Sequence, residues 1–330
     1  MQRLRAMLWI SAALLGLYVS IPEAGLGAVV AAGRQGAPLG VAAAAGALLG
    51  VIAARVARCH LLLGDARPSW RTQVSASGIG FLALQVLPFR LGEWVRPHLL
   101  SEAGVPWGRS LAALALERLL DLTALLGMVT LCSVWLPPSA QQLMGPERMA
   151  AVQLALALLM TVLIGALSSA MAAGAATTER LAGLPVLGPR LVQLVQQARL
   201  GLRGTTPSQA LGATGLTACI WAANLSVVAI LLRTFPDLPT GLAPAWVTTT
   251  ATTVGVLAVP TPGMVGSFEA AATQALQLWP TGAGSAAAVA GTWHALTLGL
   301  HGALGAALLT ARGMSLGAVV RASRAPSEAS

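Results

Sequence analysis

Six charged side chains stand inside or beside apolar sequence between residues 87 and 121. They are Arg90, Glu93, Arg96, Glu117, Arg118 and Asp121. A charge near the centre of a bilayer costs about 2.5 to 3.5 kcal/mol on insertion scales, so such groups usually pair with one another or face a wet cavity. We therefore take this stretch as the candidate functional core of the chain.

The spacing of these residues indicates a local charge network. On a helix, Glu117 and Asp121 share one face, and Arg118 is within reach of Asp121 three residues on. Two of the arginines stand three residues before and after Glu93. Glu269, from a similar break later in the chain, is expected to complete a network of three positive and four negative charges. Near-neutrality would make such a network tolerable in a membrane.

The second polar break, residues 260 to 269, combines turn residues with one acid. Pro262, Gly263 and Gly266 permit a tight turn ahead of a helix whose first turn contains Glu269. The amides of such a turn can help to bind a phosphate, with Glu269 as a gating or proton-carrying group. A carboxylate at a helix N-terminus is also stabilised by the helix dipole alone, so a purely structural role stays open.

These residue types fit the recognition of an anionic lipid headgroup. The guanidinium forks of Arg90 and Arg96 can hold a phosphate through bidentate hydrogen bonds, and the acids can orient them or contact a cationic or hydroxyl-bearing headgroup. Glu269, Asp121 and His294 are the candidates for proton coupling. The alternative is that the charges form mutually satisfied pairs that only fix helix packing.

Metal, cofactor and nucleotide chemistry are not expected. His294 and His301 are seven residues apart on one apolar segment, which favours packing over a metal site. No G-x-x-x-x-G-K-[ST] motif is present, so the chain is not expected to hydrolyse ATP. An intramembrane enzyme with Glu117 and Asp121 as acid and base is a further alternative, but no nucleophile or metal-ligand set accompanies them. We therefore expect no enzymatic activity.

The composition is that of a polytopic membrane protein. Of the 330 residues, 56% are hydrophobic and 9% are charged, with a mean hydropathy of +0.75, whereas soluble domains carry about a quarter charged residues. All 20 basic side chains are arginine, and they lie between apolar segments. That placement fits loops facing anionic lipid better than nucleic-acid binding. Cys59, Cys132 and Cys219 are expected to be free thiols.

The apolar segments predict an all-α polytopic transmembrane bundle with about six full spans, each of about 17 to 25 residues. These spans are residues 6–22, 37–57, 110–136, 149–174, 207–232 and 285–311. Two further apolar runs, residues 72–88 and 243–259, are shorter, and each ends in a break rich in proline and glycine. We interpret residues 72 to 109 and 243 to 284 as two broken re-entrant hairpins with opposite orientation.

Arginines between the segments predict the orientation, because arginine excess marks the cytoplasmic side. The marking groups are Arg3 and Arg5; Arg55, Arg58, Arg67 and Arg71; Arg180, Arg190, Arg199 and Arg203; and Arg312, Arg321 and Arg324. All four groups fall on one side if each hairpin enters and leaves on the same side. Both termini are then cytoplasmic, and the expected location is a bacterial inner membrane.

One integral membrane domain is expected over residues 1 to 321. Within it, residues 189 to 203 predict an amphipathic helix at the inner membrane surface, and residues 322 to 330 predict a disordered tail. A faint inverted repeat relates the hairpins, since the break containing Glu93 is echoed 176 residues later by the break containing Glu269. Paired segments interrupted by glycine and proline mark the transport site in inverted-repeat transporters.

Three blocks, in this order, give the chain its resemblance to a known family. They are Pro-x-Arg-x-Gly-Glu-x-x-Arg at residues 88 to 96, Glu-Arg-x-x-Asp at residues 117 to 121, and Pro-x-Pro-Gly-x-x-Gly-x-x-Glu at residues 260 to 269. The pattern resembles the lysylphosphatidylglycerol synthase transmembrane region, also called the flippase-like integral membrane family, over nearly the whole chain. The resemblance implies that the family's shared polar motifs fall on the residues above. The stretches between the predicted spans are too short for the soluble aminoacyl-transfer domain of longer members, so translocation is expected rather than lipid synthesis.

We therefore expect a transporter of a phospholipid, glycolipid or polyisoprenoid-linked lipid, with the headgroup in the charged cluster and the tails in the bilayer. Without an ATPase motif, movement would be downhill or coupled to an ion gradient. The alternative is a non-catalytic membrane scaffold for a separate lipid synthase or glycosyltransferase. A transporter predicts a water-accessible cavity around Arg90, Glu93 and Glu269, whereas a scaffold predicts a tightly packed, dry cluster.

Overall fold

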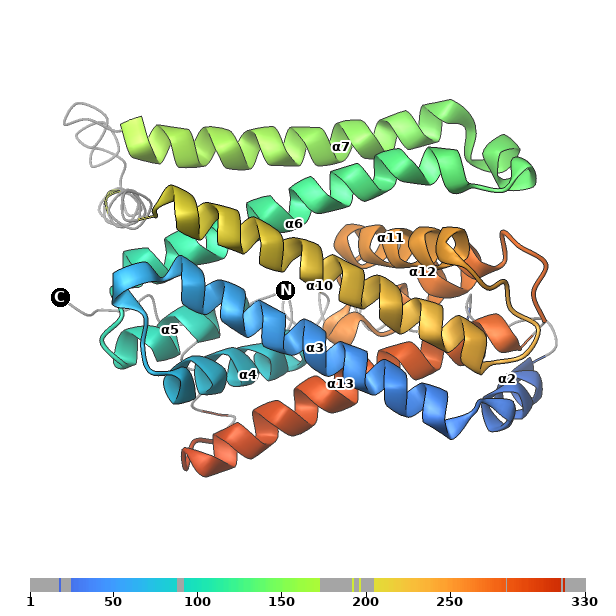
Figure 1. Cartoon of the computed structure of the whole chain (residues 1–330), viewed down its shortest axis with the longest axis horizontal. Helices are drawn as coiled ribbons and strands as arrows, with labels where there is room; N and C mark the ends of the chain where they lie inside the picture. Colours follow the sequence, from blue (N-terminus) through green and yellow to red (C-terminus); the bar gives the residue numbers. More distant parts are fainter. Residues whose placement is uncertain are drawn as a thin grey trace, which may run out of the picture.

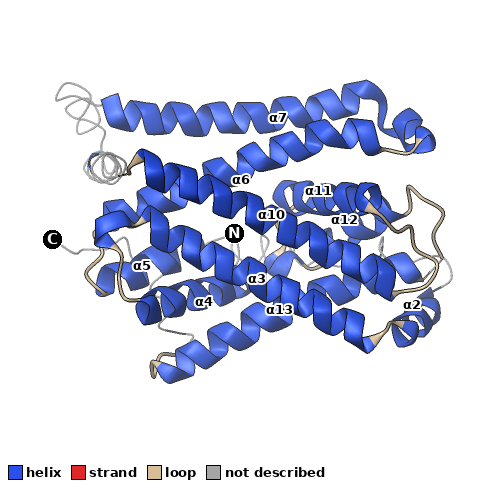
Figure 2. Ribbon diagram, in the orientation of Figure 1, coloured by secondary structure: helices blue, strands red, loops and turns tan. Residues whose placement is uncertain are grey.

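The computed structural model describes residues 25–87, 92–172, 205–282 and 284–315, together with the single residues 18, 192, 196 and 317. These described residues form α-helices and short 3-10 turns, with no strand among them (Figure 2). The predicted all-helical class is therefore confirmed for the described part of the chain.

Two long apolar helices, α3 (Pro38–Leu62) and α10 (Pro207–Thr234), pack against each other through the middle of the molecule and run in opposite directions (Figure 1). Both begin with proline in the first turn, where its missing N–H is not needed. Thr206 caps α10 in a capping box with Gln209. The pair forms the central axis on which the remaining helices are arranged.

Four further helices lie around this axis. They are α2 (Gly25–Gln35), α6 (Trp107–Trp135), α7 (Pro138–Ala172) and α13 (Ser285–Ala311). In α7 the helix is kinked at Gly145, which has a φ of 58° and is followed by Pro146. Glycine adopts this left-handed conformation without the steric cost that a side chain would add.

The first hairpin consists of α4 (Trp70–Val86) and α5 (Val95–Glu102), which pack against each other. Ser69 caps α4 by accepting a hydrogen bond from the Thr72 amide. The helix ends before Pro88, as expected because proline disfavours helical geometry in the residue that precedes it. A Cβ at Gly92 would collide with the backbone of Ala83, so only glycine lets the returning chain pass the end of α4 this closely.

The second hairpin consists of α11 (Leu242–Ala258) and α12 (Ser267–Leu276), joined by the 3-10 turn η3 (Pro262–Met264). Both α4 and α11 have 17 residues, a length of about 26 Å at 1.5 Å per residue. That is shorter than the hydrocarbon core of a bilayer, which is about 30 Å thick. Figure 1 shows α4 and α5 in one half of the long axis and α11 and α12 in the other half.

The two halves of the chain pack in a reciprocal pattern. Helix α4 of the first hairpin packs against α13, and helix α11 of the second hairpin packs against α6. The other main contacts come in matching pairs when α3, α4, α5 and α6 are set beside α10, α11, α12 and α13 in that order. For example, α5 packs on α6, and α12 packs on α13. Even the flanking helices follow the pattern, since α7 packs on α6 and α2 packs on α13. The described helices therefore contact one another in the pattern that an internal repeat would produce.

Four described segments are long and apolar enough to cross a membrane: Pro38–Leu62, Gly145–Gly165, Pro207–Thr234 and Ser285–Ala311. They correspond to four of the six predicted spans. Helix α6 covers the predicted span at 110–136 in length but carries Glu117, Arg118 and Asp121, which lower its hydropathy. The predicted first span, the amphipathic helix at 189–203 and the tail at 322–330 lie outside the described residues, apart from single positions.

Candidate functional site

An ion pair between α3 and α6 forms the base of the charged cluster. The guanidinium of Arg58 donates to both carboxylate oxygens of Asp121, over 2.7 and 3.0 Å. Its Nη1 also donates to Thr217 Oγ1 of α10 at 2.8 Å, so one arginine joins three helices. The Arg58 side chain is 2% exposed. This bidentate geometry is the strong form of an arginine to carboxylate contact.

A second ion pair joins the first hairpin to α6. Arg96 of α5 donates through Nη2 to Glu117 Oε2, and the other oxygen of Glu117 lies 3.9 Å from Arg58 Nε. Glu117 is 1% exposed and therefore sits as a buried anion between two arginines. Removing Glu117, or removing the arginines beside it, would leave a buried charge without an opposite charge to pair with.

A third, looser contact covers the cluster. Arg118 Nε lies 3.9 Å from Glu93, which follows the tip of the first hairpin, and Arg118 Nη1 lies 3.8 Å from Asp121. The side chain of Arg118 is 37% exposed, which makes this contact weaker than the two buried pairs. The predicted reach of Arg118 to Asp121 is confirmed.

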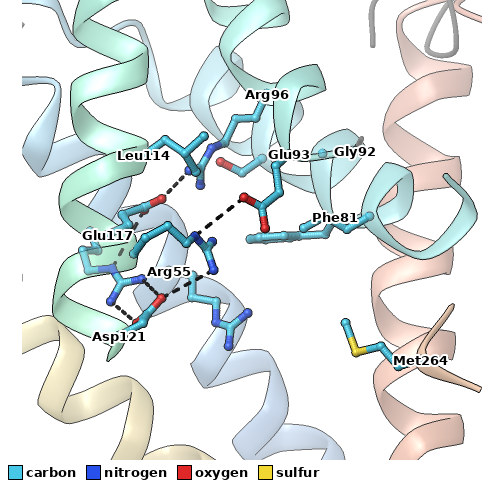
Figure 3. Close-up of a pocket in the computed structure, with 14 residues that line it drawn as sticks. Arg55, Phe81, Gly92, Glu93, Arg96, Leu114, Glu117, Asp121 and Met264 are labelled. Carbon is cyan, nitrogen blue, oxygen red and sulfur yellow. Dashed lines mark hydrogen bonds and ion pairs between the residues drawn. The ribbon is translucent and has the colours of Figure 1, made fainter. Parts of the chain in front are cut away.

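These pairs form one wall of a cavity of about 90 Å³ between α3, α4, α5 and α6 (Figure 3). Its polar wall is made by Arg55, Arg58, Glu93, Arg96, Glu117, Arg118 and Asp121. Met264 of η3 closes the cavity on the side away from the ion pairs. Since a water molecule needs about 10 to 15 Å³ of such space, the cavity has room for several waters or a small anionic group.

Arg55 is the unusual member of this cavity wall. Within the described part of the chain it makes no hydrogen bond or ion pair, and its Nε is buried. The described lining contains four arginines and three acids, so one positive charge is in excess. Because no described acid forms an ion pair with it, the Arg55 guanidinium at the edge of this cluster is available to an anionic ligand.

Arg55 and Arg58, which were expected to mark the loop after the second predicted span, both lie within α3, so the loop assignment is wrong for them. Helix α3 does not end near residue 57 but continues to Leu62, which carries both arginines into the helix bundle. The signal was present in the sequence, because the arginines are followed by the apolar residues Leu61, Leu62 and Leu63. Of the four arginines assigned to that loop, Arg67 and Arg71 lie beyond α3.

Of the other predicted site residues, the structure brings together Glu93, Arg96, Glu117, Arg118 and Asp121. Arg90 lies in residues 88 to 91, outside the described residues. Glu269 does not line the charged cavity, so the expected network is corrected at this position. Its carboxylate instead accepts a hydrogen bond from the Gly266 amide at 2.8 Å and contacts His294 Nδ1 at 2.6 Å.

The second polar break forms a tight turn, as its sequence predicts. Gly263 has a φ of 61° and Gly266 a φ of 85°, both in the left-handed region that glycine tolerates. Pro262 begins the 3-10 turn, and His294 Nε2 lies 2.9 Å from the Gly263 carbonyl oxygen. The turn is therefore held by His294 of α13, for which the sequence favours packing and leaves proton coupling as a further candidate role.

A larger, mostly apolar cavity of about 530 Å³ lies between α6, α7, α11 and α12. Val129 and Cys132 of α6 line it, together with Leu136 just beyond α6 and Met149 of α7. Cys132 lies on the helix face that carries Asp121, because eleven residues make about three turns. The charged and apolar cavities thus share one stripe of α6, on which Asp121 and Cys132 are about 16 Å apart along the axis.

Within the described residues no group of three or more histidines, cysteines and acids could hold a metal ion. Cys59, Cys132 and Cys219 are free thiols, as predicted.

Comparison with known proteins gives one positive result. The family model described as the lysylphosphatidylglycerol synthase TM region matches residues 6–305. Neither a curated protein nor a solved structure matches the chain.

Proposed function

Because the chain belongs to the lysylphosphatidylglycerol synthase transmembrane region family, we propose that it binds the anionic headgroup of a membrane lipid in the charged cavity and moves that lipid across the bilayer. The observation that carries the proposal is the guanidinium of Arg55, which makes no hydrogen bond or ion pair with the described residues and lines a cavity formed by apolar helices. A cluster that served packing alone would gain nothing from an additional half-buried cation, because an unpaired charge is costly in such surroundings.

In the proposed binding mode, the headgroup phosphate lies against Arg55, with Arg118 as the second cation because its own contacts are long. Arg58 and Arg96 keep their acid partners and hold the cavity in shape. The lipid tail leaves along the apolar stripe of α6 toward the larger cavity beside α7. In this binding mode the cavity recognises the charge of a phosphate, which phospholipids and polyisoprenoid-linked lipids share.

The membrane arrangement that we propose has six crossings and two hairpins that re-enter from opposite sides, in a bacterial inner membrane with both termini in the cytoplasm. The 17-residue lengths of α4 and α11, and their positions in opposite halves of the molecule, support it. Backbone turns at such depth are tolerated where protein or water surrounds them. The tip of the second hairpin meets these conditions, since Met264 borders the charged cavity.

Cysteine labelling tests this arrangement, after replacement of the three native cysteines. Asp65→Cys and Ala103→Cys flank the first hairpin at exposed positions, and both are expected to react from the cytoplasmic side. Thr240→Cys and Thr281→Cys flank the second hairpin, and both are expected to react from the outside. A result in which the two positions flanking one hairpin label from opposite sides would make that hairpin a full crossing.

We also propose that the chain performs no covalent chemistry of its own, since the acids of the cavity are engaged by arginines. The proposed binding partner is therefore the lipid itself. A lipid synthase or glycosyltransferase would be a separate protein that acts on the same lipid.

The transport proposal is tested by reconstituting the pure protein in liposomes that contain a headgroup-labelled fluorescent phosphatidylglycerol. A membrane-impermeant reductant bleaches the outer leaflet at once and the inner leaflet only as lipids exchange. Protein-dependent bleaching of the inner leaflet is expected, and empty liposomes give the background. If an anionic, a zwitterionic and a polyisoprenoid-linked probe all fail to exchange, the transport proposal is wrong, and the chain is better explained as a scaffold.

A further inference from the structure

One histidine ring holds the tip of the second hairpin to α13. His294 is 2% exposed, and its ring stacks on Phe268 with centroids 4.5 Å apart and planes at 11°. Its Nδ1 lies 2.6 Å from Glu269 Oε1, and its Nε2 lies 2.9 Å from the Gly263 carbonyl oxygen. The ring thus connects the turn that precedes α12 and the first turn of α12 itself. We call these two bonds the latch.

The latch requires a fixed number of protons. A neutral imidazole has one N–H, and the carbonyl oxygen of Gly263 can only accept. With an ionised Glu269, a neutral His294 could therefore donate to one of its two partners but not to both. Both bonds together need one further proton, carried either by the ring or by the Glu269 carboxyl group. We propose that the pair of His294 and Glu269 is a proton-binding site that keeps the second hairpin closed, and that release of its proton opens the hairpin during lipid transport.

The latch acts on the wall of the charged cavity. Its acceptor, Gly263, directly precedes Met264, whose side chain lines that cavity. Met264 has a φ of 61°, in the left-handed region that residues with a side chain rarely adopt. This conformation costs about 1 to 2 kcal/mol, so the tip is held against its local preference. When the bond to Gly263 is lost, the tip can relax and Met264 can leave the cavity wall.

The first hairpin carries an equivalent pair that cannot release a proton. Glu93 and Arg118 are each 176 positions before Glu269 and His294, so the two pairs correspond in the internal repeat. Arginine keeps its charge at every physiological pH. Of these two corresponding pairs, only the one in the second hairpin is therefore a proton-dependent contact, and the two hairpin tips can respond differently to the same proton gradient.

No acid other than Glu269 competes for this proton from the helices packed on α13. Helices α2, α3, α4 and α10 contain no acid in their sequences. From α4, Gln85 donates to the Thr297 carbonyl at 3.3 Å and is uncharged. The arginines of these helices lie elsewhere. Arg55 acts on His301, farther along α13, Arg58 is paired with Asp121, and Arg34, Arg71 and Arg233 are exposed.

The inference rests on the proposed transport function, but it can be tested without transport. The measurement is hydrogen exchange of the amides in residues 261 to 270 in the full chain in lipid nanodiscs, corrected for the pH dependence of chemical exchange. Because the closed state holds one proton more than the open state, protection is expected to fall as pH rises, by up to about tenfold per pH unit.

Glu269→Gln is the matched variant. A glutamine amide can donate to His294 Nδ1 and still accept from the Gly266 amide, so both bonds of the latch form with a neutral ring. The tip is expected to stay protected at all pH values. His301→Gln serves as the control, because it removes the other buried histidine of α13 and should leave the pH dependence unchanged. Glu269→Ala, which cannot form the bond, should expose the tip at every pH.

The outcomes separate the latch from transport. Wild-type protection that does not change with pH, or a pH dependence that persists in Glu269→Gln, would overturn the latch. A pH-dependent tip in a protein that exchanges no lipid would keep the latch and overturn the transport function. Lipid exchange whose rate ignores an imposed pH gradient, together with a pH-independent tip, would keep transport and overturn the latch.

Discussion

Arg55→Gln is expected to weaken the binding of an anionic lipid headgroup by about 10- to 150-fold while leaving the fold intact. Hydrogen bonds to a charged group contribute about 1.5 to 3 kcal/mol, which sets this range. The fold should survive because, among the described residues, Arg55 makes no hydrogen bond or ion pair that the variant would break. Glutamine retains the length and polarity needed to fill the position.

The measurement is a titration of the purified protein with short-chain phosphatidylglycerol, followed by tryptophan fluorescence or calorimetry. Arg233→Gln is the matched control, since it removes the same charge from an exposed position on α10 outside the cavity. A second titration with inorganic phosphate distinguishes recognition of the headgroup phosphate from recognition of the whole lipid. Equal affinity in wild type and Arg55→Gln would show that the cavity does not bind anions through this residue.

Glu117→Gln is expected to have the largest effect on stability, about 3 to 5 kcal/mol or complete loss of folded protein. The variant leaves Arg96 buried without its anion and takes the second acid away from Arg58. Unpaired charge of this kind is among the few causes of destabilisation above 4 kcal/mol from one substitution. The loss of stability is measured by thermal unfolding in detergent, with the fraction of monodisperse protein as the readout.

Two comparisons make this result specific. Glu102→Gln removes an exposed acid that contacts only His98, at 3.3 Å in the described contacts, and should change stability by less than about 0.5 kcal/mol. The pair Arg96→Met and Glu117→Leu removes both charges and should recover much of the lost stability, because apolar replacement of a buried ion pair is often neutral. If Glu117→Gln is as stable as wild type, the buried pair does not organise the cavity.

Much of the architecture follows from local sequence signals. Proline and glycine after two short apolar runs predicted the positions of both hairpins, because these residues end helices wherever they occur. The charges between residues 93 and 121 predicted the contact of Arg118 with Asp121 and the inclusion of Arg96 and Glu117 in one cluster. The described helices α3, α10 and α13 match predicted spans because length and hydropathy are properties of the segment itself.

The parts that could not be predicted depend on tertiary packing. In the sequence, Arg55 and Arg58 resemble the basic end of a membrane span. The structure shows that α3 continues past them and that α6 and α10 bury Arg58, which depends on how these helices pack. Glu269 and His294 are 25 residues apart, and their contact depends on how α12 docks onto α13. The apolar cavity has no motif at all, because it is defined by the space that four helices leave between them.

The reciprocal packing of the hairpins also has a consequence for the order in which the molecule is assembled. Helix α4 is synthesised early, whereas its packing partner α13 is synthesised after all the other helices named above. About 200 residues separate them, which at 5 to 20 residues per second is about 10 to 40 s of synthesis. During that interval the first hairpin lacks its partner surface. The polar groups of the charged cluster must therefore be sheltered by α3 and α6 alone, or by an insertion factor, until the chain is nearly complete.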